Sequence, residues 1–111
     1  MAFAEQQIFQ ARENSTNAVS VYSPGASEIA IIKFLTICNQ SGATATVRIF
    51  VDDNGTTYDE NTALYWDLTI PANYTLAQNV FIAMDDQTGN IAYRSSVANA
   101  LTISGWGAII T

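Results

Sequence analysis

The sequence predicts an all-β fold: an antiparallel two-sheet β-sandwich, jelly-roll or immunoglobulin-like, with about eight strands. Short stretches of alternating apolar and polar residues recur along the chain, separated by turn-forming Asn, Gly, Pro and Ser residues about every 8 to 12 positions. No stretch carries the 3.6-residue apolar spacing of an amphipathic helix. With 111 residues, 49% of them hydrophobic, the chain has material for one core, so we expect a single domain over residues 1–111.

The N-terminal part contains one clear strand. Residues 1–17 have no clean period, and the adjacent Ile8 and Phe9 leave an N-terminal arm, a short helix or an edge strand open. From Ala18 to Tyr22 apolar and polar side chains alternate, which predicts a short strand that ends at the turn-forming Ser23-Pro24-Gly25.

The stretch from Glu28 to Asp52 predicts two long strands. Its first half is apolar on both faces, as is typical of a strand in the middle of a packed structure. Its second half alternates, with one predicted core face: Ala45, Val47, Ile49 and Val51. The polar segment Asn39-Gln40-Ser41-Gly42 between them favours chain reversal. We therefore predict a hairpin at the centre of the core, with Cys38 as an inert packing residue.

The C-terminal half predicts several shorter strands. We expect them at 56–58, 64–70, 74–77, 80–84, 91–96 and 100–104. In the 64–70 strand the predicted inward face consists of Leu64, Trp66, Leu68 and Ile70. The last residues, to Thr111, stay apolar and can form an outer strand or dock on another chain.

Charge and composition exclude several classes of function. The net charge is −6, and the four basic residues are scattered, which argues against binding to nucleic acid or to an anionic membrane. There is no histidine for a Ser-His or Cys-His arrangement. Three adjacent acid pairs, Asp52-Asp53, Asp59-Glu60 and Asp85-Asp86, lie in predicted turns, and their side chains diverge along an extended chain. We therefore expect no catalytic residues, no cofactor and no enzyme.

The sequence also bears on metals and on the compartment. Asp52-Asp53-Asn54-Gly55 offers oxygen ligands, but its glycine comes too early for an EF-hand loop, so a plain turn is the better interpretation. A single cysteine excludes an internal disulfide. The opening MAFAEQQIFQ lacks the basic and apolar regions of a signal peptide, so we expect synthesis in a cytoplasm.

The composition favours a subunit that packs against other proteins. Only 13% of residues are charged, about half the usual share, and Thr, Ser, Asn and Gln fill most polar positions. Such a surface costs little to desolvate. The candidate interface residues are Ile8, Phe9, Tyr65, Tyr74, Trp106, Ile109 and Ile110. Alternatively, four aromatic residues form a sugar-binding platform: Tyr65, Tyr74, Tyr93 and Trp106.

Three segments resemble the small all-β structural proteins of tailed bacteriophage virions. They are VYSPGASEIAIIKFLTICNQSGATATVRIFVDDNGTTY, LYWDLTIPANYTL and NVFIAMDDQTGNIAYRSSVANALTISGWG, which together span about residues 19 to 107. The shared features are a Tyr/Pro/Gly turn, a long apolar strand ending in Asn-x-Ser-Gly, a Thr/Val-rich strand and a Pro-Ala-Asn turn. One departure is Met84-Asp85-Asp86-Gln87-Thr88-Gly89, where such chains usually carry Leu-x-x-Gly-Asp.

The resemblance implies a non-enzymatic virion protein. The leading expectation is a capsid decoration (cement) protein that binds the major capsid protein, bridges capsomers and forms a homo-oligomer, with a trimer favoured. A neck or tail component is the alternative within the same class. A carbohydrate-binding module on a host-facing appendage is the alternative from another class, resting on the aromatic residues.

Overall fold

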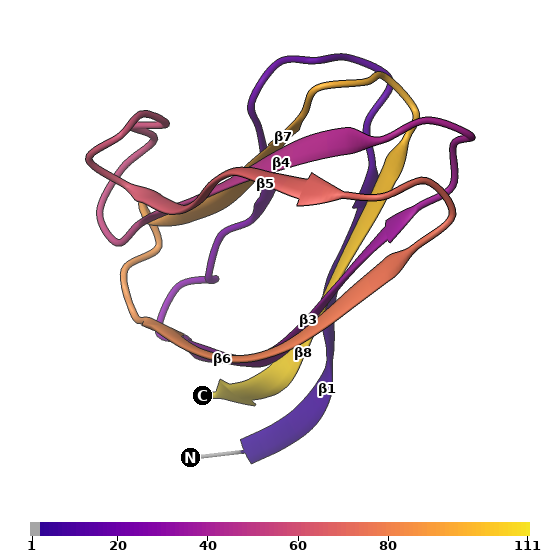
Figure 1. Ribbon diagram of the computed structural model, residues 1–111. Coiled ribbons are helices and arrows are strands. Elements are labelled where there is room, and N and C mark those ends of the chain that lie inside the picture. Colours follow the sequence, from indigo (N-terminus) through magenta and orange to yellow (C-terminus); the bar gives the residue numbers. More distant parts are fainter. Residues whose placement is uncertain (1–2) are drawn as a thin grey trace.

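The computed structural model describes residues 3–111, which fold into two antiparallel four-stranded β-sheets. The all-β sandwich predicted from the sequence is confirmed (Figure 1). The described residues contain no helix, and thus none that could span a membrane. The eight strands are β1 (Phe3–Arg12), β2 (Val19–Tyr22), β3 (Ile29–Asn39), β4 (Ala45–Asp52), β5 (Ala63–Ile70), β6 (Thr75–Met84), β7 (Asn90–Ser95) and β8 (Leu101–Ile110).

The strand order is that of a jelly roll. One sheet has the order β1-β8-β3-β6 and the other β2-β7-β4-β5. Each strand of the first half therefore pairs antiparallel with its counterpart in the second half: β1 with β8, β2 with β7, β3 with β6 and β4 with β5. A long two-stranded ribbon folded over itself gives this pattern. Of the two architectures that the sequence left open, the jelly roll is the one formed.

The predicted hairpin between 28 and 52 is wrong, although both of its strands exist. β3 pairs with β6 and β8, whereas β4 pairs with β5 and β7 in the other sheet. The segment between them crosses from one sheet to the other. Buried Asn39 fixes this crossing, because its side-chain amide donates to the carbonyl oxygens of Ala43 and Ile70, each at 2.9 Å. Turn-forming residues predict that the chain bends, but not which strands pair.

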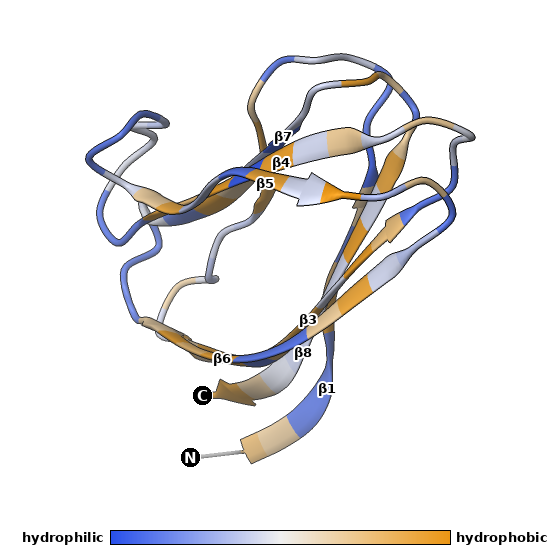
Figure 2. Cartoon of the chain, viewed as in Figure 1, coloured by the Kyte–Doolittle hydropathy of each residue, from blue (hydrophilic) through white to orange (hydrophobic). Residues whose placement is uncertain are grey.

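The core lies between the sheets and takes buried side chains from both of them. Figure 2 shows hydrophobic residues along the strands of each sheet. β3 occupies an interior position of its sheet, as its two apolar faces predicted. Its inner face contributes Ile32, Leu35 and Ile37, which are at most 1% exposed. From the facing sheet, the predicted inward residues Val47 and Ile49 are both completely buried.

The predicted inward face of β5 is wrong at Leu64 and Trp66, and Leu68 is also 38% exposed, so only Ile70 is buried as expected. Leu68 pairs with buried Val47, but Tyr65 pairs with buried Ile49. Two residues therefore lie opposite Arg48, and Asp67 takes up the extra length with a φ of 51°. A one-residue slip exchanges the two faces of a strand. Consequently Tyr65 turns toward the core, while Leu64 and Trp66 are each 44% exposed.

Three further strand predictions also change. The pieces expected at 74–77 and 80–84 form one strand, β6, and the strand expected at 100–104 continues to Ile110 as β8. Residues 56–58 form no strand. They belong to a loop in which the backbone N–H groups of Asn54 and Thr57 donate to the buried carboxylate of Asp52.

Candidate interaction surfaces

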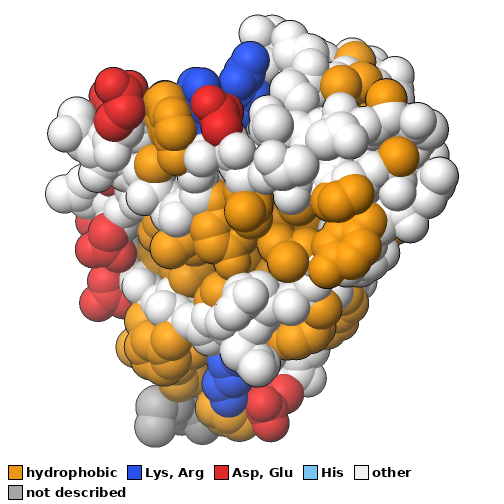
Figure 3. All heavy atoms as spheres, viewed as in Figure 1, with side chains coloured by type: hydrophobic (Ala, Val, Ile, Leu, Met, Phe, Trp, Pro, Cys, Tyr) orange, Lys and Arg blue, Asp and Glu red, His pale blue; other side chains and the backbone are white. Residues whose placement is uncertain are grey.

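One side of the sandwich is apolar and uncovered. We call it the β5–β6 side, because β5 and β6 are the edge strands of the two sheets there. It holds five of the seven large hydrophobic side chains that are exposed among residues 3–111, and these five are Leu64, Trp66, Leu68, Tyr74 and Phe81. Figure 3 looks onto this side and shows a broad apolar area between β5 and β6, with charged side chains around its rim.

The strand irregularity in β5 builds the polar margin of this side. The Arg48 guanidinium donates to both carboxylate oxygens of Asp67, at 2.6 and 2.9 Å, and its carbon lies 3.7 Å from the centroid of the Trp66 ring. These hydrogen bonds lower the pKa of Asp67 and raise that of Arg48. A stacked cation paired with a carboxylate fixes the indole against the sheet. The Trp66 ring is therefore presented to solvent in one orientation.

β6 presents the most exposed aromatic side chain of the described part of the chain. In the pairing with β3, Ile82 lies opposite Ile32 and Asn79 opposite Phe34. Two residues of β6, Val80 and Phe81, therefore face Lys33 alone. Val80 packs against the core, and Phe81 is 75% exposed.

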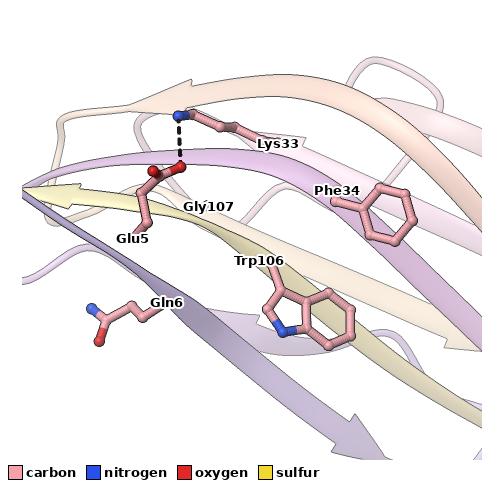
Figure 4. Close-up of a pocket in the computed structure, with 6 residues that line it drawn as sticks. All are labelled: Glu5, Gln6, Lys33, Phe34, Trp106 and Gly107. Atoms are coloured by element: carbon pink, nitrogen blue, oxygen red, sulfur yellow. Dashed lines mark hydrogen bonds and ion pairs between the residues drawn. The ribbon is translucent and has the colours of Figure 1, made fainter.

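A second feature is a hollow of about 380 Å³ on the outer face of the β1-β8-β3-β6 sheet, over β1, β8 and β3. Figure 4 shows its two aromatic walls, Phe34 and Trp106, with ring centroids 6.2 Å apart. Across Gly107, the Lys33 ammonium lies 3.2 Å from a carboxylate oxygen of Glu5. The hollow thus combines aromatic faces with exposed polar groups.

Two glycines allow this arrangement in β8. A Cβ on Gly105 would overlap the ring of Phe9, and a Cβ on Gly107 would overlap the main chain of Ile31. Only glycine permits such close approach of neighbouring strands. Trp106, between the two glycines, is held in the sheet and stays half-buried on its outer face.

The structure does not gather the predicted interface residues into one patch. Ile8 is half-buried and packs against the core, and Phe9 is 6% exposed, with its ring stacked on Tyr22. Ile109 and Ile110 are half-buried in β8, paired with β1 and β3. Tyr74 belongs to the β5–β6 side, Trp106 to the hollow, and Tyr65 packs partly against the core.

The predicted sugar platform is also not assembled from its four members. Tyr93 is 1% exposed, its hydroxyl accepts from the N–H of Glu13 at 2.7 Å, and burial raises its pKa. Burial likewise raises the pKa of Tyr65. Trp106 has Phe34 as its aromatic neighbour instead.

The acidic turns use their carboxylates to hold backbone. Hydrogen bonds from the N–H groups of Thr57 and Asn54 lower the pKa of Asp52, and one from the N–H of Thr88 lowers that of Asp86. Within residues 3–111, no group of three or more His, Cys, Asp or Glu residues is placed to hold a metal ion.

Sequence reasoning did not single out Phe81 as a surface residue, and it placed Leu64, Trp66 and Leu68 on the inward face of their strand, whereas all four are exposed. One signal was available for Phe81, since the segment 75–84 contains no charged residue and no proline. For Trp66 there was none, because the exchange of faces in β5 arises from its register against β4.

Comparison with known proteins gives a likeness of fold. No protein-family model matches the sequence, and no curated protein matches it either. Among solved structures, a chain of the T13 viral particle of infectious bursal disease virus superposes with a TM-score of 0.59 and 9% identity, covering 97% of this chain and 30% of that one. This chain is similar in fold to a protein of an icosahedral virus particle.

Two further structures of the same virus show the same likeness of fold. A chain of the Gx strain of the same virus gives a TM-score of 0.51 at 11% identity, covering 96% of this chain and 29% of that one. The VP2 subviral particle gives 0.50 at 12% identity, covering 97% and 32%. The described sandwich therefore spans less than a third of the length of the viral chains it matches, and at these identities the likeness concerns the fold alone.

Proposed function

We propose that this protein is a non-enzymatic structural subunit of a virion. The observation that carries the proposal is the β5–β6 side, an apolar and almost uncharged surface on a jelly roll that resembles chains of an icosahedral virus particle. An exposed apolar area of this extent is typical of a protein–protein contact. Neighbouring virion proteins, including the major capsid protein, are the partners that this reasoning favours.

Within that role we propose a capsid decoration protein. Its contact with the outer shell rests on the low charge of the chain and on the resemblance of residues 19 to 107 to small phage structural proteins. A decoration protein binds an assembled shell from outside, so its removal leaves the shell intact. A neck or tail component is instead present in a few copies at a single vertex of the shell.

Electron cryomicroscopy of purified particles from the virus that encodes this chain tests both the virion role and the decoration role. We expect density for the jelly roll on the outside of the shell, repeated with the icosahedral lattice, with the β5–β6 side covered by a neighbouring subunit. Density at one vertex would replace decoration by the neck or tail role. Particles that lack the chain, both in the map and by peptide mass spectrometry, would refute a virion role.

Glycan binding is a second candidate, favoured by the hollow at Trp106. Its aromatic walls suit the apolar face of a sugar ring, and Glu5, Gln6 and Lys33 supply donors and acceptors at the rim. Indole fluorescence of a Trp66→Phe protein reports on Trp106 alone during titration with a panel of soluble glycans. A saturable change that Trp106→Leu abolishes would support the site, and an unchanged spectrum with every glycan would exclude it.

A further inference from the structure

We propose that strand β6 pairs antiparallel with β6 of a second copy of this chain, joining the two β1-β8-β3-β6 sheets into one continuous sheet about a two-fold axis at Ala77. This inference rests on the proposed function, since it names one partner of the β5–β6 side. It starts from the difference between β6 and the other sheet edges.

Free sheet edges in soluble proteins are normally protected against pairing with other chains, and three of the four edges here are. β1 carries Glu5 and Arg12, β2 has only four residues, and β5 is interrupted at Asp67 by a left-handed residue with a charged side chain. β6 is ten residues long and contains no charge and no proline. The only feature of β6 that could hinder pairing with another chain is the irregularity at Val80 and Phe81, and it leaves residues 75–79 in unbroken register with β3.

This run is suited to pair with itself. When the axis passes through Ala77, Ala77 faces its own copy, and Thr75 faces Asn79 of the second copy. Directly opposed side chains in an antiparallel pair lie close together, and here both pairs are small or polar and uncharged. Ala77 is exposed and pairs with Thr36 on the outer face of the sheet, so the two alanine methyl groups meet without obstruction.

The same register bears on the most exposed aromatic residue of this side, Phe81, which is 75% exposed in the single chain. Phe81 and Ala77 share the outer face of the sheet, because positions an even number apart along a strand point to the same side. Counting along the paired strands, Phe81 of one copy falls just beyond Thr75 of the other, where β6 begins. The two-fold axis repeats this on both sides of Ala77, so that each Phe81 ring lies at the start of the second copy's β6.

Area and charge agree with a second copy as the occupant. The five side chains of the β5–β6 side expose on the order of 500 Å², taking about 200 Å² for a large side chain. A standard interface covers about 800 Å² per partner, so the backbone and the polar residues of β6 supply the rest. The segment 63–84 holds one of the ten acidic residues, Asp67, which Arg48 neutralises, so the net charge of −6 does not oppose self-association at this surface.

Two-fold pairing predicts a dimer rather than the trimer implied by the phage resemblance. A trimer needs two different patches, and the other edge strands are the protected ones. Sedimentation velocity of the full chain over a concentration series should therefore resolve a monomer–dimer equilibrium. A chain that stays monomeric up to millimolar concentration, or that forms a trimer, would overturn the proposal.

Charge substitution at the axis is the sharpest test. Ala77→Lys places two ammonium groups opposite each other, so the dissociation constant should rise about tenfold or more. Lysine also lowers the net negative charge, so greater overall repulsion cannot cause the loss. Ala77→Glu should weaken the dimer likewise, whereas an equal mixture of the two variants should restore it as a heterodimer. Gln7→Lys, an exposed change on β1, is the matched control and should leave the equilibrium unchanged.

Hydrogen exchange supplies an independent readout. Amides in the run 75–79 should become more protected as the concentration rises, and those of β1 should not. Dimerisation that Ala77→Lys and Ala77→Glu leave intact, or protection gained on β1 instead, would refute pairing through β6. A monomeric chain that is nevertheless present in virions would refute this inference alone, whereas a dimer absent from virions would refute the proposed function.

Discussion

Gly107 gives the sharpest stability prediction, because its environment leaves no room for a side chain. In Gly107→Ala the new Cβ would lie 2.8 Å from the carbonyl carbon of Ile31 and closer still to its oxygen, whereas real Cβ atoms keep at least 3.0 Å. The obstacle is the backbone of β3, which pairs with β8 along its whole length. To accommodate a methyl group, the two strands must separate by roughly 1 Å, which a close-packed interior does not absorb freely.

The magnitude follows from what the separation breaks. Overpacking a core costs about 1 to 3 kcal/mol, and each ladder hydrogen bond that is lost or stretched adds about 0.5 to 1.5 kcal/mol. We therefore expect Gly107→Ala to lower the free energy of unfolding by about 3 kcal/mol or more, which corresponds to a fall in Tm of roughly 10 to 20 °C. Urea unfolding followed by circular dichroism measures it.

Gly42 provides the matched control. A Cβ there meets nothing within 4 Å, and no glycine among residues 3–111 has a positive φ. Gly42→Ala should therefore stay within about 0.5 kcal/mol of the wild type. At Gly105 the obstacle is the ring of Phe9, so Phe9→Leu should recover part of the loss in Gly105→Ala. Equal stability of the Gly107→Ala and Gly42→Ala proteins would refute the reasoning.

Three further predictions concern polar groups. Pairing with Arg48 lowers the pKa of Asp67, so the stability from this pair is present above the ordinary pKa of 3.8 and is lost as the pH falls through the lower folded pKa. Asp67→Asn should therefore flatten the profile of Tm against pH between about pH 5 and 2. An unchanged profile would contradict this. Asn39→Ala removes the amide that donates to Ala43 and Ile70 and should cost about 2 to 3 kcal/mol in urea unfolding; a cost under 0.5 kcal/mol would mean that water replaces it. Burial raises the pKa of Tyr93, so the stability of the folded chain is maintained below the ordinary pKa of 10 and falls as the pH rises above it. Tyr93→Phe should reduce this loss of stability at alkaline pH. At neutral pH the same variant should cost about 1 kcal/mol, because the N–H of Glu13 loses its acceptor.

The candidate surfaces were only partly predictable. Composition alone indicated a surface suited to contact with other proteins. Among the aromatic residues, Tyr74 and Trp106 were identified in the sequence as candidate interface residues. Phe9 looked equally suitable by sequence, but it fills the space over Gly105 inside the sandwich. Exposure depends on which strand covers a side chain, and that is a property of the assembled sheets.

By itself, the sequence determined the fold class, most of the strands, the interior position of β3 and most of the inner face of β4, because alternation and turn residues act over a few positions. Only the tertiary structure decided that β3 and β4 lie in different sheets, since strand partners distant in the chain compete for each edge and the jelly roll pairs β3 with β6 and β8. It also decided the exposure of Trp66, because one extra residue in β5 opposite Arg48 exchanges the faces of that strand. The apolar β5–β6 side, and with it the proposed pairing surface, arises from that register and from the place of β5 and β6 at the sheet edges.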